Sequence, residues 1–95
     1  RRALEINPAN HKAWMNLGVA LASLGRVAES EPLFRRAAEL DAKDPGATAN
    51  LGLSLAHLGR WNEAATWFQR TLELDPGYPD ARRNLEICRA KASTP

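Results

Sequence analysis

The chain has 95 residues, 44% hydrophobic and 25% charged, a composition that fits one small folded domain and argues against a disordered segment. Its formal net charge is only +2 with both signs interspersed, so neither nucleic acid nor an anionic membrane is an expected partner. No run of about 18 apolar residues is present, which argues against a membrane-spanning helix. The single cysteine, Cys88, excludes an internal disulfide and fits a reducing compartment, so we expect a cytoplasmic protein.

A repeat with a period of 34 residues organises the sequence. Residues 11–44 align without gaps on residues 45–78, and identical residues fall at many of the paired positions. The identical pairs include Asn16 and Asn50, Leu17 and Leu51, Gly18 and Gly52, Gly25 and Gly59, and Phe34 and Phe68. Ungapped periods of this length are typical of stacked-repeat proteins, so we expect one repeat over residues 11–44 and a second over residues 45–78.

Residues 1–9 match the end of a repeat and are expected to be the tail of a preceding one, as if the chain began within a longer array. The first helix of repeat 1 is expected to follow Asn10, whose side chain can accept a hydrogen bond from an unpaired amide of the first turn. Gly25 is expected to end this helix, because glycine readily adopts the left-handed conformation of a helix C-cap. The second helix is expected over residues 27–40.

Pro32 interrupts that second helix, because proline lacks an amide hydrogen and its ring clashes with the preceding turn. Two alternatives remain open from the sequence. Either the helix bends at Pro32, or Ser30 caps a regular helix that begins at Glu31 and places Pro32 in its first turn.

Repeat 2 is expected to follow the same plan as repeat 1. Asp44, which precedes Pro45, is expected to cap its first helix, because a short acidic side chain and a proline at the first helical position both favour a helix start. Gly59 is expected to end that helix, and the second helix is expected over residues 61–74.

The last segment is expected to be a capping helix over residues 79–92, followed by a disordered tail at residues 93–95. Arg82, Glu86 and Arg89 stand at positions where the earlier helices carry residues that pack on a following helix. A polar outer face is typical of the terminal unit of a repeat array, so we expect the array to end here.

The residue types at fixed places in each repeat resemble those of the tetratricopeptide repeat family. Trp14, Leu17 and Gly18 stand in the first helix, Gly25 and Arg26 in the turn, and Leu-x-Leu-Asp-Pro at residues 72–76 ends the second repeat. The resemblance covers essentially the whole chain and implies an all-α, right-handed helical-repeat solenoid of stacked antiparallel helix pairs with a C-terminal capping helix. Gly18 and Gly52 then allow the paired helix to approach closely, because they carry no side chain.

Catalysis has little support in the sequence. His11 and His57 have no cysteine or carboxylate cluster at metal-ligand spacing around them, and Cys88 has no histidine nearby in sequence. We therefore expect no catalytic residue, no metal site and no cofactor. His57 is expected to be a solvated residue near a helix C-terminus, and Cys88 a small packing residue.

A second stripe of residues runs along each first helix beside its core face. In the tetratricopeptide repeat family the matching positions line a concave groove, so by resemblance this stripe binds a protein or peptide partner. Met15, Val19, Leu53 and Ile87 are apolar residues of the stripe that the core does not require, which suggests an interaction site. The candidate groove residues are Lys12, Met15, Asn16, Val19, Ala49, Asn50, Leu53, Arg83, Asn84 and Ile87.

Asn16, Asn50 and Asn84 recur along this stripe, and we call them the asparagine ladder. Each amide offers donors and an acceptor that can pair with the backbone of an extended peptide, and a similar ladder occurs in the repeat superhelix of the glycosyltransferase that attaches N-acetylglucosamine to proteins. The alternative is a structural ladder, in which each asparagine bonds to a neighbouring turn.

Chaperone-binding members of the family grip a C-terminal carboxylate with a clamp of lysine, arginine and asparagine side chains. At the matching positions this chain has Met15, Val19, Asn50, Asp80 and Asn84, of which only Asn50 fits fully. Acidic chaperone tails are therefore not expected ligands of this segment.

The sequence thus predicts a non-catalytic protein-interaction module that presents a concave groove to a peptide or helix. One alternative is a regulatory or substrate-docking extension of an enzyme whose catalytic domain lies outside this chain. Another is self-association, as a homodimer through a truncated N-terminal edge that includes Trp14 and Leu33.

Overall fold

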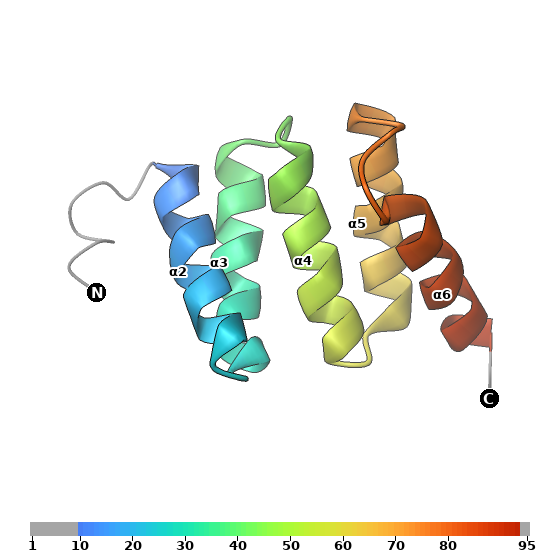
Figure 1. Ribbon diagram of the computed structural model, residues 1–95, viewed down its shortest axis with the longest axis horizontal. Coiled ribbons are helices and arrows are strands. Elements are labelled where there is room, and N and C mark those ends of the chain that lie inside the picture. The colour runs from blue at the N-terminus through green and yellow to red at the C-terminus, as the bar shows by residue number, and fades with distance from the viewer. Residues whose placement is uncertain (1–9, 94–95) are drawn as a thin grey trace.

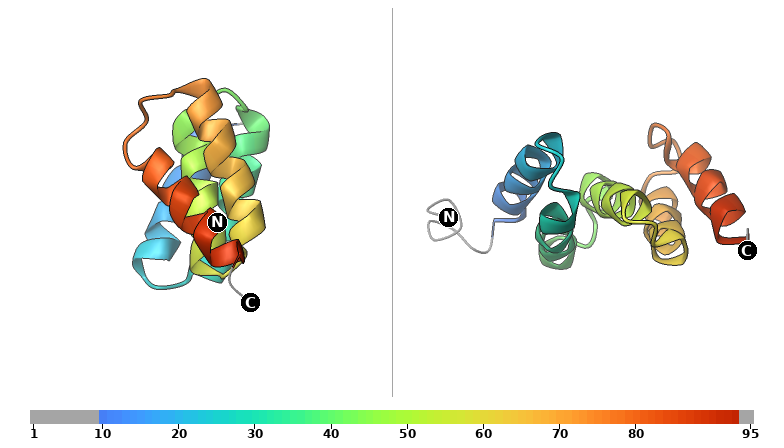
Figure 2. Two further views of the ribbon diagram at one scale, coloured as in Figure 1. Left: turned by 90° about the vertical axis from the view of Figure 1, so that its right-hand side faces the viewer. Right: turned by 90° about the horizontal axis from the view of Figure 1, so that it is seen from below.

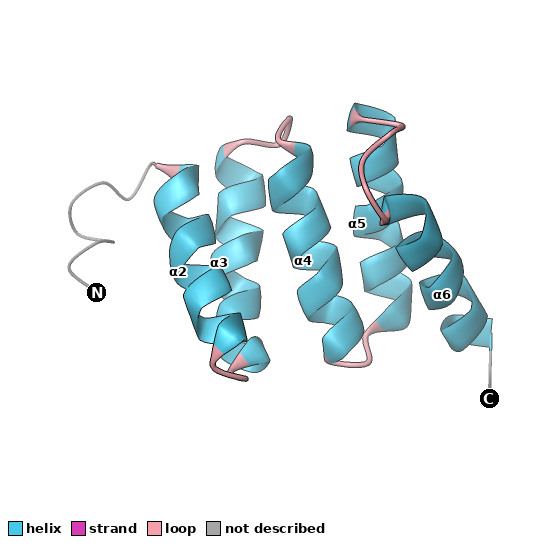
Figure 3. Ribbon diagram, viewed as in Figure 1, coloured by secondary structure: helices cyan, strands magenta, loops and turns pink. Residues whose placement is uncertain are grey.

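The computed structural model describes residues 10–93, and within that range it contains five α-helices and no strand. The helices are α2 (His11–Ser23), α3 (Val27–Leu40), α4 (Pro45–His57), α5 (Trp61–Leu74) and α6 (Ala81–Ser93), joined by short turns (Figures 1 and 3). The all-α helical-repeat fold is confirmed. The tail expected at residues 1–9 lies outside the described residues. Helix α6 begins at Ala81, two residues after its expected start, and it ends at Ser93, which was expected to belong to a disordered tail.

The helices stack side by side in chain order and form two layers. Each helix packs against the next one along the chain, and α2 also contacts α4. Seen end-on in Figure 2, α2, α4 and α6 lie in one layer, and α3 and α5 lie in the other. The first helix of each repeat therefore shares one face of the molecule with its counterparts.

The helix ends follow the expected capping chemistry. The side chains of Asn10 and Asp44 accept hydrogen bonds from the backbone amides two residues later, at 3.0 and 2.9 Å. Gly25 and Gly59 adopt positive φ angles of 80° and 78°. Paired backbone bonds of the Schellman type close both turns, since the amide of Arg26 donates to Leu21 and that of Gly25 to Ala22, with the same pattern one repeat later.

Gly18 and Gly52 face the second helix of their own repeat across a tightly packed contact. A Cβ atom at Gly18 would stand 2.7 Å from Cε1 of Phe34, and one at Gly52 would stand 3.0 Å from Cζ of Phe68. Both rings are buried in the core, which confirms that the glycines permit close helix approach. The remaining buried members of the core are Ala37, Ala38, Ala47, Leu51, Leu55, Ala64, Leu85 and Cys88.

Pro32 lies inside α3, which begins at Val27 with Arg26 as its N-cap residue. The expectation that Ser30 caps a helix restarting at Glu31 is therefore wrong. Ser30 is fully buried, and its hydroxyl donates to the carbonyl oxygen of Val27 at 2.8 Å. Pro32 thus falls in the second turn, where its missing amide hydrogen removes one bond of the helix.

Two hydroxyl pairs lie buried between helices. Ser30 and Ser54 join α3 to α4 with an oxygen–oxygen distance of 3.4 Å, and Thr48 and Thr71 join α4 to α5 at 2.7 Å. All four hydroxyls are satisfied, so these polar residues replace apolar ones without leaving an unpaired group in the core. They account for two departures from the repeat pattern, since Ser30 aligns with Ala64 and Thr48 with Trp14.

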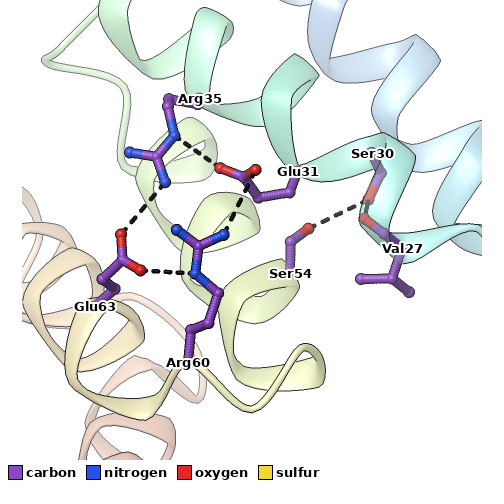
Figure 4. Close-up of polar contacts among 7 residues, drawn as sticks. All are labelled: Val27, Ser30, Glu31, Arg35, Ser54, Arg60 and Glu63. Atoms are coloured by element: carbon purple, nitrogen blue, oxygen red, sulfur yellow. Dashed lines mark hydrogen bonds and ion pairs between the residues drawn. The ribbon is translucent and has the colours of Figure 1, made fainter.

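Charged side chains link α3 to the start of α5, within the layer that these two helices form (Figure 4). Arg35 Nε donates to Glu31 at 2.7 Å, and Arg60 Nε donates to Glu63 at 2.7 Å. Longer contacts cross between the pairs, from Arg35 to Glu63 at 3.6 Å and from Arg60 to Glu31 at 3.9 Å. The hydrogen bond from Arg60 is the main cause that holds the pKa of Glu63 below its usual value.

Helix α6 has an exposed, charged outer face, as expected for Arg82, Glu86 and Arg89. Arg89 donates to Gln69 on α5 at 3.0 Å. None of the described helices is long and apolar enough to cross a membrane.

Candidate functional site

A hollow of about 290 Å³ opens between α2 and α4. Its wall is mostly apolar, with Val19 and Leu53 at the mouth, 47% and 39% exposed. The complete lining is Val19, Ala22, Ser23, Val27, Phe34, Asn50, Leu53, Ser54 and His57.

A second hollow of about 270 Å³ opens between α4 and α6. It shares Asn50 and Leu53 with the first, so the two hollows adjoin along α4. We call the surface formed by both hollows the groove. The complete lining of the second hollow is Ala49, Asn50, Leu53, Phe68, Tyr78, Pro79, Asp80, Ala81, Arg83 and Asn84.

Six of the ten predicted groove residues line these hollows, namely Val19, Ala49, Asn50, Leu53, Arg83 and Asn84. The other four, Lys12, Met15, Asn16 and Ile87, line neither hollow. Met15 is partly buried and packs against the core, so the prediction that the core does not require it is wrong. Ile87 is 44% exposed on α6, which agrees with a residue outside the core.

The asparagine ladder does not bond to neighbouring turns. Within residues 10–93, no side-chain hydrogen bond engages Asn16, Asn50 or Asn84. Asn50 lies between the two hollows, where its amide keeps both donors and its acceptor. The structural alternative thus lacks the hydrogen bonds that it requires in this part of the chain.

Sequence reasoning missed several groove residues. Phe34 and Val27 reach the first hollow from α3, behind the helices that carry the predicted stripe. Tyr78 and Pro79 enter the second from the loop between α5 and α6. Only Tyr78 gave a signal that could have been used, as an aromatic residue within a proline-rich turn.

Few charges lie at the groove. No Asp, Glu, Lys or Arg side chain lines the first hollow. In the second, Arg83 donates to Asp80 at 3.1 Å, so the two charges offset each other. His57 lies at the end of α4, as expected, and its Nδ1 donates to the carbonyl oxygen of Leu53 at 2.8 Å, which leaves Nε2 as its other polar atom.

His11 has carboxylate neighbours that the sequence analysis did not predict. Its Nε2 lies 2.9 Å from Asp44 and 3.5 Å from Asp41, because stacking brings the turn before α4 beside the start of α2. These are ligand types that a divalent cation accepts. Asp44, however, already uses its other oxygen to cap α4 at Gly46. The cluster forms a polar contact between the start of α2 and the turn that follows α3.

Cys88 is buried in the core, as expected of a packing residue. Burial raises the pKa of its thiol, because it disfavours the charged thiolate.

Comparisons with known proteins identify the repeat. A model of the tetratricopeptide repeat matches residues 1–46, and a second model of that repeat matches residues 45–78. A comparison with curated proteins gives no match.

Similar solved structures carry the same fold. YrrB, described as a TPR protein with an unusual peptide-binding site, is 32% identical with a TM-score of 0.83, over 87% of this chain and 43% of that one. The TPR domain of Arabidopsis OM64 is 26% identical with a TM-score of 0.84, over 92% and 72% of the two chains. The second TPR domain of human RPAP3, solved with the HSP70 peptide SGPTIEEVD, is 28% identical with a TM-score of 0.86, over 93% and 73%.

The present chain spans less than half the length of YrrB. The two matching repeat models together cover residues 1–78, and the stacked helix pairs with glycine-capped turns give the same assignment. This chain belongs to the tetratricopeptide repeat family.

Proposed function

We propose that this chain is a protein-interaction module that holds an extended segment of a partner protein in the groove. The observation that carries the proposal is the place of Asn50, whose amide has no partner within the described residues and lies where two hollows meet. Such an amide can pair with one peptide unit of the partner, whatever side chain the partner carries at that position.

The bound segment is extended, because only an extended segment has free backbone groups that can pair with the amide of Asn50. Backbone N–H and C=O groups inside a helix already pair with each other, whereas those of an extended segment are free. A helix would therefore offer Asn50 only its side chains. Exposed apolar groups on either side, Val19 and Leu53 among them, supply contact area for the side chains of such a segment.

The relatives support a binding role. YrrB is described as having a peptide-binding site, and the RPAP3 domain holds a peptide. Both are similar to this chain over most of its length, although the chain matches only part of YrrB. A role in binding rather than in catalysis agrees with these relatives.

The test is a selection of short random peptides on phage against the folded chain, followed by calorimetry of the selected peptides. Asn50→Ala should weaken binding by about 1–3 kcal/mol, because the partner's buried peptide group loses its hydrogen bond. Asn62→Ala is the matched control, since Asn62 is an exposed asparagine on α5 that lines neither hollow of the groove. The proposal would be overturned by equal losses of affinity for Asn50→Ala and Asn62→Ala, or by selected peptides that bind Asn50→Ala as tightly as the unmodified chain.

A further inference from the structure

We infer that the groove selects a segment that is uncharged where it docks and that inserts one apolar side chain into the hollow between α2 and α4. This inference rests on the proposed function and adds the chemistry of the partner to it.

The first hollow favours an apolar side chain. Val19, Ala22, Val27, Phe34 and Leu53 form most of its wall, and no Asp, Glu, Lys or Arg side chain lines it. A charged side chain placed there would lose its hydration without gaining an ionic partner, which is costly. A branched or aromatic side chain would instead remove apolar surface from water on both sides of the contact.

The polar groups of this hollow are mostly engaged. Ser54 pairs with Ser30, and Nδ1 of His57 is bonded to its own helix. The amide of Asn50 and Nε2 of His57 remain, and both can form a hydrogen bond to a peptide unit or a hydroxyl. The hollow thus offers hydrogen bonds to neutral groups, and no Lys or Arg in its lining offers a charge-assisted bond to a carboxylate.

The second hollow gives no net preference for an acidic segment. Its one basic side chain, Arg83, is held by Asp80 at 3.1 Å. A peptide carboxylate that binds the remaining donors of Arg83 would lie close to the negative charge of Asp80, which offsets the attraction. Charge complementarity across both hollows therefore favours a neutral segment over an acidic one.

The test uses the selected peptides and one defined acidic probe, the peptide SGPTIEEVD with a free C-terminus. Selected peptides should share an apolar residue whose replacement by alanine weakens binding about tenfold. Their affinity should change less than about twofold between about 50 mM and about 500 mM NaCl, since no ion pair is formed. The acidic probe should bind more weakly than the selected neutral peptides.

Leu53→Asp and Leu58→Asp form a matched pair of variants. Both leucines are on or next to α4 with exposures of 39% and 37%, but only Leu53 lines the groove. Leu53→Asp should abolish binding of neutral peptides, and Leu58→Asp should leave it within about twofold. Circular dichroism of both variants establishes that each still folds.

The outcomes separate the two claims. Selected peptides that are acidic, sensitive to salt and still dependent on Asn50 would overturn this inference and leave the proposed function standing. Peptides whose affinity is unchanged by Asn50→Ala and by Leu53→Asp, or a selection that yields no binding peptide, would overturn both the proposed function and this inference.

Discussion

Replacing Gly18 by alanine tests the close approach of α2 and α3. The new Cβ would lie 2.7 Å from Cε1 of Phe34 and 3.0 Å from two further ring atoms, and this ring belongs to a residue that is only 3% exposed. Overpacking of this kind costs about 1–3 kcal/mol. Alanine regains about 1 kcal/mol of helix propensity, so we expect a net loss of about 1 kcal/mol in the free energy of unfolding. The assay is urea unfolding followed by circular dichroism.

A second background isolates the clash. Phe34→Leu removes the ring atoms that the new Cβ would touch, so in that background Gly18→Ala should no longer destabilise and should show the propensity gain. Gly52→Ala is a milder version, because its nearest atom, Cζ of Phe68, would lie 3.0 Å away. An equal effect of Gly18→Ala in both backgrounds, or a gain in the unmodified chain, would refute the steric explanation.

Three further changes probe stability elsewhere. Pro32→Ala should stabilise the fold by at least several tenths of a kcal/mol, because it restores an amide to the second turn of α3; lower stability in urea would mean that the proline is fitted to the fold. Thr48→Val should lower the free energy of unfolding by about 1 kcal/mol. The two hydroxyls share one hydrogen bond, so Thr71→Val should cost less in the Thr48→Val background than in the unmodified chain. Equal costs of Thr71→Val in both backgrounds would contradict this. Arg60→Gln should return the pKa of Glu63 toward its usual value. The unmodified chain should therefore be more stable than the variant at pH 7, and this difference should disappear as the pH falls below about 4. A difference in stability that does not change with pH would contradict the ion pair between Arg60 and Glu63.

Features that depend on neighbouring residues could be predicted from the sequence. Asn10 and Asp44 cap helices because a short oxygen-bearing side chain reaches an amide two residues away, and Gly25 ends α2 because of its own backbone freedom. The 34-residue repeat then carried these local assignments from one helix pair to the next. The role of Gly18 also followed, because a glycine in a helix interior needs a packing reason.

Features that depend on stacking could not be predicted in the same way. His11 meets Asp44 because α2 and α3 pack as an antiparallel pair, which returns the end of repeat 1 to its start although the sequence separates these residues by almost one period. Met15 and Val19 fall on the same stripe, but Met15 packs beside Gly46 at the start of α4, whereas Val19 stays exposed at the first hollow. For Ser30, local capping preference predicted a helix start, whereas burial between α3 and α4 decides its role.

The hydroxyl pair between α4 and α5 has a consequence for anyone who averages these repeats into a consensus. Thr48 and Thr71 correspond, one period earlier, to Trp14 and Ala37, so one repeat combines two medium residues where the other combines a large residue with a small one. Choosing the commonest residue at each position separately would combine tryptophan with threonine, or threonine with alanine. The first mixture would put a tryptophan ring where Thr48 and Thr71 now meet, and the second would remove one hydroxyl of that pair. These two positions therefore form one design variable and have to be exchanged together.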